Sequence, residues 1–203
     1  MDLKKRLFTI ILSCEKYRHK MLSQDTSRLG DYMYFIGDPK LSSPVVKWRG
    51  SSGAVHLPCP DNYESLTQKS LLAIKWAVEH KDFDLLLKTD DDVTFRTGFD
   101  KVVNDALQYD YSGKPEKGGY ESSWHSGKCE NKKLHSIKFP VPPGKYCQGH
   151  AYFLSKKSAL ILAKHELEDG HCIYEDVEVG NILSKSRIFA QRLNLKRGFK
   201  FVW

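Results

Sequence analysis

The chain has 203 residues, a length that suits one domain with a substantial hydrophobic core. Hydrophobic residues make up 40% of it and charged residues 28%, which excludes a chain that is disordered as a whole. The formal net charge of +7 is compatible with three kinds of partner: nucleic acid, an anionic membrane surface, or an anionic small substrate such as a nucleoside diphosphate.

The cysteines and the start of the chain bear on its compartment. The five cysteines form no CxxC pair and no N-x-[ST] sequon is present, so the sequence favours a reducing compartment. The apolar run at residues 7–12 is too short to span a membrane, and no cleavage site of small residues follows it. We therefore expect a soluble, cytoplasmic chain without a membrane segment; the Golgi lumen would apply only if a membrane anchor had been removed.

The first part of the chain predicts alternating strands and helices. The run LFTIILSC is apolar and β-branched, as in a central strand that is buried on both faces. The expected elements are a strand over 7–14, a helix over 15–28, a strand over 32–36, and, within 44–60, a loop with a short strand near Val55.

The pattern continues with a helix that Asp61 or Asn62 can cap. Its apolar residues repeat every three or four positions and form one stripe, made of Thr67, Leu71, Ile74 and Val78. The remaining expected elements are a buried strand over 83–88, a helix over 99–109, a long loop with a hairpin over 112–138, a strand over 151–154, a helix from Ser155 to about residue 165, and a short helix near Tyr174. This alternation predicts an α/β fold with a largely parallel sheet flanked by helices.

The acidic triplet Asp90, Asp91 and Asp92 directly follows the buried strand over 83–88. Three adjacent carboxylates repel one another, and ligands of open α/β sheets bind beyond the carboxyl ends of the strands. Carboxylate oxygens suit Mg²⁺ or Mn²⁺, and alternate residues of a strand point to one face, which favours Asp90 and Asp92 as the pair of ligands. An acidic turn or a helix cap is the alternative.

Two further segments carry chemistry-bearing side chains. Residues 175–180 (EDVEVG) contain carboxylates, one of which could accept a proton from a substrate hydroxyl; alternatively, they are only the acidic start of a helix. Residues 146–152 (YCQGHAY) combine aromatic and hydrogen-bonding side chains, as a sugar site needs, or are a loop that enters a core strand. Within this segment His150 by itself suits a buried, hydrogen-bonded histidine better than a ligand, and Cys147 suits a small core residue better than a nucleophile.

The order and spacing of four segments resemble those of the β-1,3-galactosyltransferase family (glycosyltransferase family 31, related to the Fringe enzymes). The segments are residues 62–70 (NYESLTQKS), 86–93 (LLKTDDDV), 146–155 (YCQGHAYFLS) and 175–180 (EDVEVG). The similarity runs from about residue 7 to residue 180. It implies a GT-A fold, a UDP-sugar donor, a divalent metal ion (Mn²⁺ or Mg²⁺) and inversion at the anomeric carbon.

The resemblance also implies roles for individual residues. Asp90 and Asp92 match the metal-binding motif, Asp91 matches a position near the donor ribose or sugar, and Asp176 matches the base that deprotonates the acceptor. Positions around the donor and acceptor match Lys88, Gly149 and Glu175, and the aromatic segment adds Tyr146 and His150 as substrate-binding candidates.

The chain departs from the family in three respects. Its N-terminal region lacks the arginine-rich motif that ends in a tryptophan, no histidine follows His171 to complete the metal ligands, and the membrane anchor common in the family is missing. Residues 185–203 form a basic tail without any acidic residue. This tail could supply part of the positive charge of a histidine-bound metal ion, and we expect Arg192 and Arg197 to grip a diphosphate. Alternatively, the tail is a solvated strand, anchored by the alternating aromatics Phe199, Phe201 and Trp203.

Together these patterns predict an inverting glycosyltransferase. We expect a single catalytic domain over 1–203, with a nucleotide-sugar half over about 1–110 and an acceptor and base half over about 111–203. The expected partners are a UDP-sugar donor and a glycan or glycoprotein acceptor, and no nucleic acid. A metal-dependent nucleic-acid-binding protein or nuclease, and a non-catalytic sugar-binding module, are the alternatives.

Overall fold

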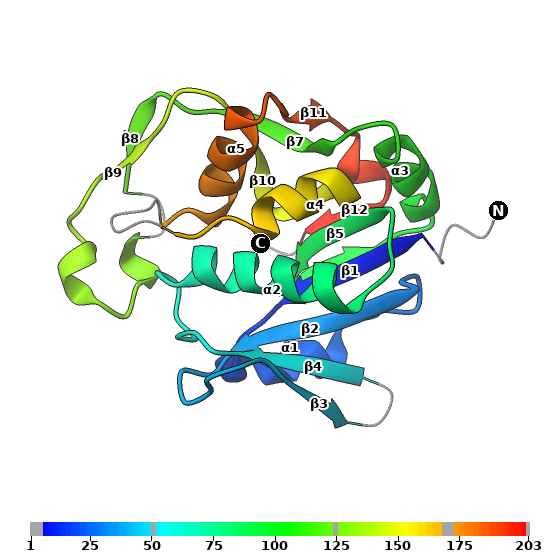
Figure 1. The fold of residues 1–203 in the computed structure, drawn as a ribbon, viewed down its shortest axis with the longest axis horizontal. Coiled ribbons are helices and arrows are strands. Elements are labelled where there is room, and N and C mark those ends of the chain that lie inside the picture. The colour runs from blue at the N-terminus through cyan, green and yellow to red at the C-terminus, as the bar shows by residue number, and fades with distance from the viewer. Residues whose placement is uncertain (1–5, 50–51, 124–125, 168–172, 202–203) are drawn as a thin grey trace.

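The structure of the protein is a computed structural model that describes residues 6–49, 52–123, 126–167 and 173–201. It contains one eight-stranded sheet with helices on both faces (Figure 1). The helices are α1 (Arg18–Ser23), α2 (Leu66–His80), α3 (Phe99–Ala106), α4 (Lys156–Ala163) and α5 (Glu175–Lys185). The strands of the large sheet are β1 (Leu7–Leu12), β2 (Asp31–Gly37), β3 (Val45–Arg49), β4 (Ser52–Leu57), β5 (Leu85–Asp90), β7 (Tyr111–Lys117), β10 (Lys145–Ser155) and β11 (Gln191–Arg192).

The strand order is β11-β7-β10-β5-β1-β2-β4-β3. The central strands β5, β1, β2 and β4 are parallel neighbours. On one side β10 runs antiparallel to β5 and to β7, and at the far edge β3 runs antiparallel to β4. The α/β fold with a mostly parallel sheet flanked by helices is therefore confirmed.

The apolar sequence of β1 fits a strand that is covered on both faces. Phe8, Ile10 and Leu12 face the core beneath α2, α4 and α5, whereas Leu7 and Ile11 face the core formed with α3. In Figure 1 the helices α2, α4 and α5 lie on the near face of the sheet. Within the described ranges, no helix is both long and apolar enough to cross a membrane.

Two small sheets complete the fold. β6 (Val93–Phe95) pairs with β12 (Phe199–Phe201), so the C-terminal aromatics pack beside α3, as the alternation of aromatic residues predicts. Trp203 lies outside the described residues. β8 (Tyr120–Ser122) pairs with β9 (Phe139–Val141) and, with the 3-10 turns Ser126–Lys128 and Lys132–Leu134, forms a lobe beside α5.

Several predicted elements agree with the structure. The stripe of α2 faces the core, and Ser155 caps α4 by accepting a hydrogen bond from the Ser158 N–H. The strands predicted over 32–36 and 83–88 correspond to β2 and β5, and the helix predicted near Tyr174 corresponds to α5. The two halves predicted on either side of residue 110 contribute strands to one sheet, and their division of labour stays a prediction.

Two predicted elements are wrong and one strand was missed. The helix over 15–28 is only the 3-10 turn Glu15–Tyr17 followed by α1, because the segment beyond it forms a local turn in which Asp25 accepts the Ser27 N–H. The edge strand β3 was missed because Val45, Val46 and Trp48 are all exposed and show no alternation. The long loop over 112–138 is wrong at its start, where β7 enters the main sheet despite its polar composition.

Candidate functional site

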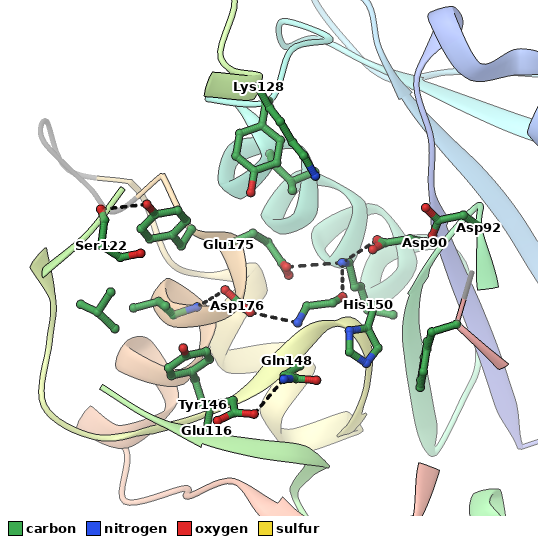
Figure 2. Close-up of a pocket in the computed structure, with 18 of the residues that line it drawn as sticks. Asp90, Asp92, Glu116, Ser122, Lys128, Tyr146, Gln148, His150, Glu175 and Asp176 are labelled. Atoms are coloured by element: carbon green, nitrogen blue, oxygen red, sulfur yellow. Dashed lines mark hydrogen bonds and ion pairs between the residues drawn. The ribbon is translucent and has the colours of Figure 1, made fainter. Parts of the chain in front are cut away.

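A cavity of about 650 Å³ opens beside the end of β5, the middle of β10 and the first turn of α5. Figure 2 shows Asp90, Asp92 and His150 at one end, Ser122 and Tyr146 at the other, and Glu175 and Asp176 between them. The described residues that line it are Tyr63, Leu66, Lys88, Asp90, Asp92, Glu116, Tyr120, Ser122, Lys128, Val141, Tyr146, Gln148, Gly149, His150, Tyr174, Glu175, Asp176, Val177 and Phe201.

The acidic triplet divides between the cavity and the protein interior. β5 ends at Asp90, and Asp91 and Asp92 form the turn that follows it. Asp90 and Asp92 both line the cavity, as the D-x-D pattern predicts, and both side chains are partly exposed. Asp91 is buried and accepts a 2.6 Å hydrogen bond from the Ser13 hydroxyl at the end of β1. Asp91 is thus part of the support of this turn, and it does not line the cavity.

Lys88 is 1% exposed and carries its ammonium group beneath the floor of the cavity. The nitrogen lies 2.9 Å from Asp90 Oδ1, 3.3 Å from Glu175 Oε2 and 2.5 Å from the Gly149 carbonyl oxygen. An ammonium has three N–H donors, so these three acceptors use all of them. Burial lowers the pKa of Lys88, but the charges of Asp90 and Glu175 outweigh it, and the net pKa is raised. Lys88 therefore stays charged and holds Asp90, Glu175 and the Gly149 carbonyl close together.

Glu175 is the first residue of α5 and is buried. One carboxylate oxygen faces Lys88, and the other accepts a short hydrogen bond from the Tyr152 hydroxyl. Burial raises the pKa of Glu175, and Lys88 and Tyr152 act in the opposite direction. Both oxygens thus have internal partners, which makes Glu175 a supporting group rather than the free base of the site.

Asp176 lies next to Glu175, lines the cavity and is of intermediate burial. Oδ2 accepts the Gly149 N–H at 2.9 Å, and Oδ1 accepts the Val177 N–H at 2.9 Å. A carboxylate has about four acceptor positions, so each oxygen keeps capacity for a further donor. Burial, followed by the charge of Glu175, raises the pKa of Asp176 to about 7, although Lys88 and the two backbone N–H groups oppose the shift. A carboxylate of this kind can exchange a proton near neutral pH.

An irregularity in β10 brings this segment to the cavity. The register with β7 shifts between Cys147, opposite Pro115, and Tyr152, opposite Gly113. Such bulges redirect side chains and are frequent beside functional sites. A Cβ on Gly149 would lie 3.2 Å from Glu175 Oε2, so a glycine allows the close approach of β10 to α5.

The neighbours of Gly149 have different surroundings. His150 lines the cavity against the Phe201 ring, with 3.9 Å between the ring centres, and burial lowers its pKa to about 4. The imidazole is therefore neutral at pH 7. Cys147 is fully buried, and burial raises the pKa of its thiol to about 12, which confirms it as a core residue rather than a nucleophile.

The other end of the cavity is rich in tyrosines. The hydroxyls of Tyr120 and Tyr146 lie 3.0 Å apart. Gln148 donates from Nε2 to Glu116 Oε1 at 2.7 Å, while its buried Oε1 has no hydrogen-bond partner among the described residues. Tyr146 was predicted, whereas Glu116 and Tyr120 were missed because they fall in the segment expected to be a loop. An unpaired acceptor beside aromatic faces suits a ligand that presents both hydroxyls and apolar patches.

A second buried ion pair, between Lys69 and Asp61, connects the end of β2 with the segment that follows β1. Lys69 of α2 lies 2.5 Å from Asp61 Oδ1 and 3.0 Å from the Ser13 carbonyl oxygen. Asp61 also accepts the N–H groups of Glu15 and Gly37, which follow β1 and end β2. Of the two predicted caps of α2, Asp61 is excluded because its oxygens are used in this way, whereas Asn62 Oδ1 accepts the Ser65 N–H at 3.1 Å in the turn just before the helix.

A comparison of the sequence with protein-family models identifies the family to which this site belongs. The family model described as galactosyltransferase matches residues 54–194, which is more than half of the chain. The chain belongs to the galactosyltransferase family. The match contains the acidic turn, the bulged segment of β10 and the first turn of α5, so every described residue that lines the cavity except Phe201 lies within the family's region. No curated protein sequence matches the chain.

Solved structures similar to this galactosyltransferase family member are distant in sequence. The A197 protein from STIV is 18% identical, with 93% of this chain and 81% of that chain covered and a TM-score of 0.45. A protein from Bacillus anthracis, described as a candidate glucose-1-phosphate thymidylyltransferase in complex with sucrose, is 12% identical, with 96% and 89% covered and a TM-score of 0.49. Both TM-scores are below 0.5, and the family assignment rests on the sequence match.

The basic tail of this family member runs elsewhere. Arg192 is an exposed residue of β11 at the edge of the large sheet, and Arg197 packs beside Gly98 at the start of α3. Neither is among the residues that line the cavity, whereas Phe201 is. The expectation that these two arginines grip a diphosphate thus has no support in their positions.

The divalent ion implied by the family fits the acidic turn only in part. Across the described ranges, no group of three or more His, Cys, Asp or Glu side chains is arranged to hold a metal ion. Asp90 and Asp92 nevertheless offer carboxylate oxygens to the same cavity. Mg²⁺ is commonly bound by one or two carboxylates together with substrate phosphates, so the pair fits an ion that a diphosphate helps to hold.

Proposed function

We propose that this galactosyltransferase family member is an inverting glycosyltransferase. It would move a hexose or N-acetylhexosamine from a UDP-sugar to a hydroxyl of a glycan or glycoprotein, with a β-1,3 linkage as the expected product. The observation that carries the proposal is that Asp176, with a pKa of about 7, shares one cavity with Asp90 and Asp92. A base and a site for an anionic leaving group are the two parts that a single displacement needs.

Asp176 would act as the base. An acceptor hydroxyl donates to one of its oxygens, and the proton passes to the carboxylate as the hydroxyl oxygen attacks the anomeric carbon. The bond between that carbon and the diphosphate oxygen breaks, and the nucleoside diphosphate leaves with the electron pair. The N–H groups of Gly149 and Val177 hold the carboxylate in one orientation during this step.

The leaving diphosphate would lie at the end of the cavity where Asp90 and Asp92 are. A divalent ion held by these two residues would neutralise charge on the diphosphate. Lys88 keeps the Asp90 carboxylate in place from beneath and, through Glu175 and the Gly149 carbonyl, ties it to the segments that hold the base. We therefore assign Lys88 and Glu175 as positioning residues.

The acceptor would occupy the end with the tyrosines. Sugar rings present apolar C–H faces and hydroxyl edges, and Tyr120, Tyr146 and the unpaired Oε1 of Gln148 match these two features. The segment that carries Lys128 is held against the start of α2, because Glu64 accepts the N–H groups of Glu130 and Asn131. Because Lys128 lines the cavity, this segment would contact the acceptor and contribute to the choice among acceptors.

A panel of UDP-sugars with Mn²⁺ tests the proposal. We expect saturable, metal-dependent binding of UDP, release of UDP from one donor in the presence of a glycan acceptor, and release slowed by roughly two or more orders of magnitude in the Asp176→Asn variant. Metal-dependent binding without release in any combination would favour a non-catalytic sugar-binding module. Binding of DNA or RNA that weakens steeply with salt, without UDP binding, would favour the nucleic-acid alternative.

A further inference from the structure

Lys20 brings a cation to the acidic turn that follows β5. Its ammonium nitrogen lies 3.5 Å from Asp92 Oδ2 and 3.9 Å from Asp91 Oδ1. It also lies 4.6 Å from the centre of the Tyr17 ring, within the range of a cation–π contact. Lys20 belongs to α1, so the N-terminal segment that lacks the family's arginine-rich motif still places a positive charge beside the turn.

The position of Lys20 differs from that of Lys88 in a way that matters for ligands. Lys88 is buried and makes short contacts, whereas the side chain of Lys20 is 34% exposed. Its two separations from carboxylate oxygens exceed the 2.7–3.2 Å of an ordinary N–H···O hydrogen bond. Moving the Lys20 ammonium therefore breaks no short hydrogen bond to either aspartate.

Three adjacent carboxylates need compensating charge when no ligand is bound. Asp90 has the Lys88 ammonium for this purpose, whereas Asp91 is buried and accepts a hydrogen bond from the neutral Ser13 hydroxyl, with Lys20 at 3.9 Å. For Asp92, Lys20 is the cation that the structure records within 4 Å among the described residues. Asp92 is also one of the two carboxylates that fit a divalent ion, so Lys20 and such an ion would compete for the same oxygens.

We propose that the Lys20 ammonium is the resident counter-charge of this turn and that a divalent ion must displace it to bind Asp92. The displacement makes the affinity for the ion weaker than the two carboxylates alone would give. Under the proposed function, on which this last step rests, the displaced ammonium remains beside the donor diphosphate and adds positive charge there. The chain thereby obtains some of the charge that a histidine-completed metal site would supply.

The affinity for Mn²⁺ alone tests this inference, measured by its effect on water proton relaxation at low salt. We expect Lys20→Met to bind Mn²⁺ about fivefold to tenfold more tightly than the unmodified protein, because one nearby positive charge is removed in a solvent-exposed setting. Lys20→Arg keeps the charge and should stay within about twofold of the unmodified protein by the same reasoning.

Lys16→Met is the matched control. Lys16 lies 5.6 Å from the same Tyr17 ring and makes no ion pair with a carboxylate among the described residues. This variant loses the same charge from the same segment, and its Mn²⁺ affinity should change by less than about twofold. Equal affinities in Lys20→Met and Lys16→Met, including no detectable binding in either, would overturn the inference.

UDP titrated into the same proteins separates this inference from the proposed function. Tighter Mn²⁺ binding by Lys20→Met together with UDP binding supports both. Tighter Mn²⁺ binding without UDP binding in any of the proteins supports the role of Lys20 and contradicts the transferase. Added NaCl should reduce the difference between the two methionine variants, because the charges are partly exposed and salt screens them.

Discussion

The backbone N–H of Gly149 donates to Asp176 Oδ2 at 2.9 Å and so joins the bulged part of β10 to the first turn of α5. The carbonyl oxygen of the same glycine accepts from Lys88, whose ammonium contacts Asp90. One peptide segment thus connects the proposed base with the proposed diphosphate end.

Replacing the proposed base should stop turnover and leave donor binding intact. We expect Asp176→Asn to lower kcat by roughly two or more orders of magnitude, the usual scale for loss of a general base. The affinity for UDP should change little, because the role belongs to the transition state. An asparagine retains one acceptor oxygen for the two N–H groups of Gly149 and Val177, so thermal unfolding must accompany the kinetics. A folded variant with near-normal kcat would contradict the assignment.

The pH dependence of kcat/KM should follow the titration of Asp176. Its pKa is raised to about 7, mainly by burial, and the base acts only when deprotonated. The rate should therefore rise about tenfold per pH unit below pH 7 and level off above it. A profile that is flat between pH 5.5 and 8 at constant ionic strength would remove Asp176 from the rate-limiting proton transfer.

The same pKa predicts a pH dependence of stability. The folded state holds a proton on Asp176 up to about pH 7, whereas the ordinary pKa of 3.8 applies when the chain is unfolded. Between these values the folded state binds more protons, so the contribution of this group to the free energy of unfolding falls as the pH rises from about 4 to 7. Urea titrations of the unmodified protein and Asp176→Asn should show a shallower fall in the variant. Identical slopes would contradict the raised pKa.

The two aspartates of the cavity should respond differently to substitution. Asp92→Ala should abolish Mn²⁺-dependent UDP binding while the fold survives, and loss of one carboxylate from a repelling cluster should stabilise the unliganded protein slightly. Asp90→Ala, in contrast, should lower the free energy of unfolding, because it removes a partner of the buried Lys88 ammonium. Calorimetry and thermal unfolding of both variants make the comparison. Unchanged UDP affinity in Asp92→Ala would exclude that residue from the site.

The buried pair of Lys88 and Glu175 should show strong coupling. Lys88→Met leaves the Glu175 carboxylate buried without its cation, and such a change costs about 3–5 kcal/mol of unfolding free energy. Adding Glu175→Gln removes the uncompensated charge and should recover a large part of that loss. A double-mutant cycle from urea unfolding measures the coupling, and additive effects would mean that the pair acts independently.

The strands and helices around the site follow from local patterns, but its assembly does not. The apolar runs of β1 and β5, the stripe of α2 and the Ser155 cap are local signals, and they agree with the structure. The contact of Lys88 with Glu175 joins residues far apart in the chain, and no periodicity reveals it. Glu116 and Tyr120 follow a polar stretch without alternation, so the sequence predicts neither their strands nor the side that they face.

Residues of one type also proved different in their surroundings. Asp90 and Asp92 face the cavity while Asp91 is buried against Ser13, since the strand ends at Asp90 and a turn follows. Arg192 and Arg197 attracted a functional prediction because of their charge, yet the cation recorded within 4 Å of Asp92 among the described residues is Lys20, in a segment whose predicted helix was too long. Charge can be counted from the sequence, but its location depends on the tertiary structure.

The ion pair between Asp61 and Lys69 has a consequence for the cost of binding. It fixes the chain immediately after β1 and at the end of β2 through four internal contacts, and Ser13 extends the connection to Asp91. These internal contacts hold the two segments in place without a ligand, so under the proposed function little conformational entropy of the chain would be lost there when a donor binds.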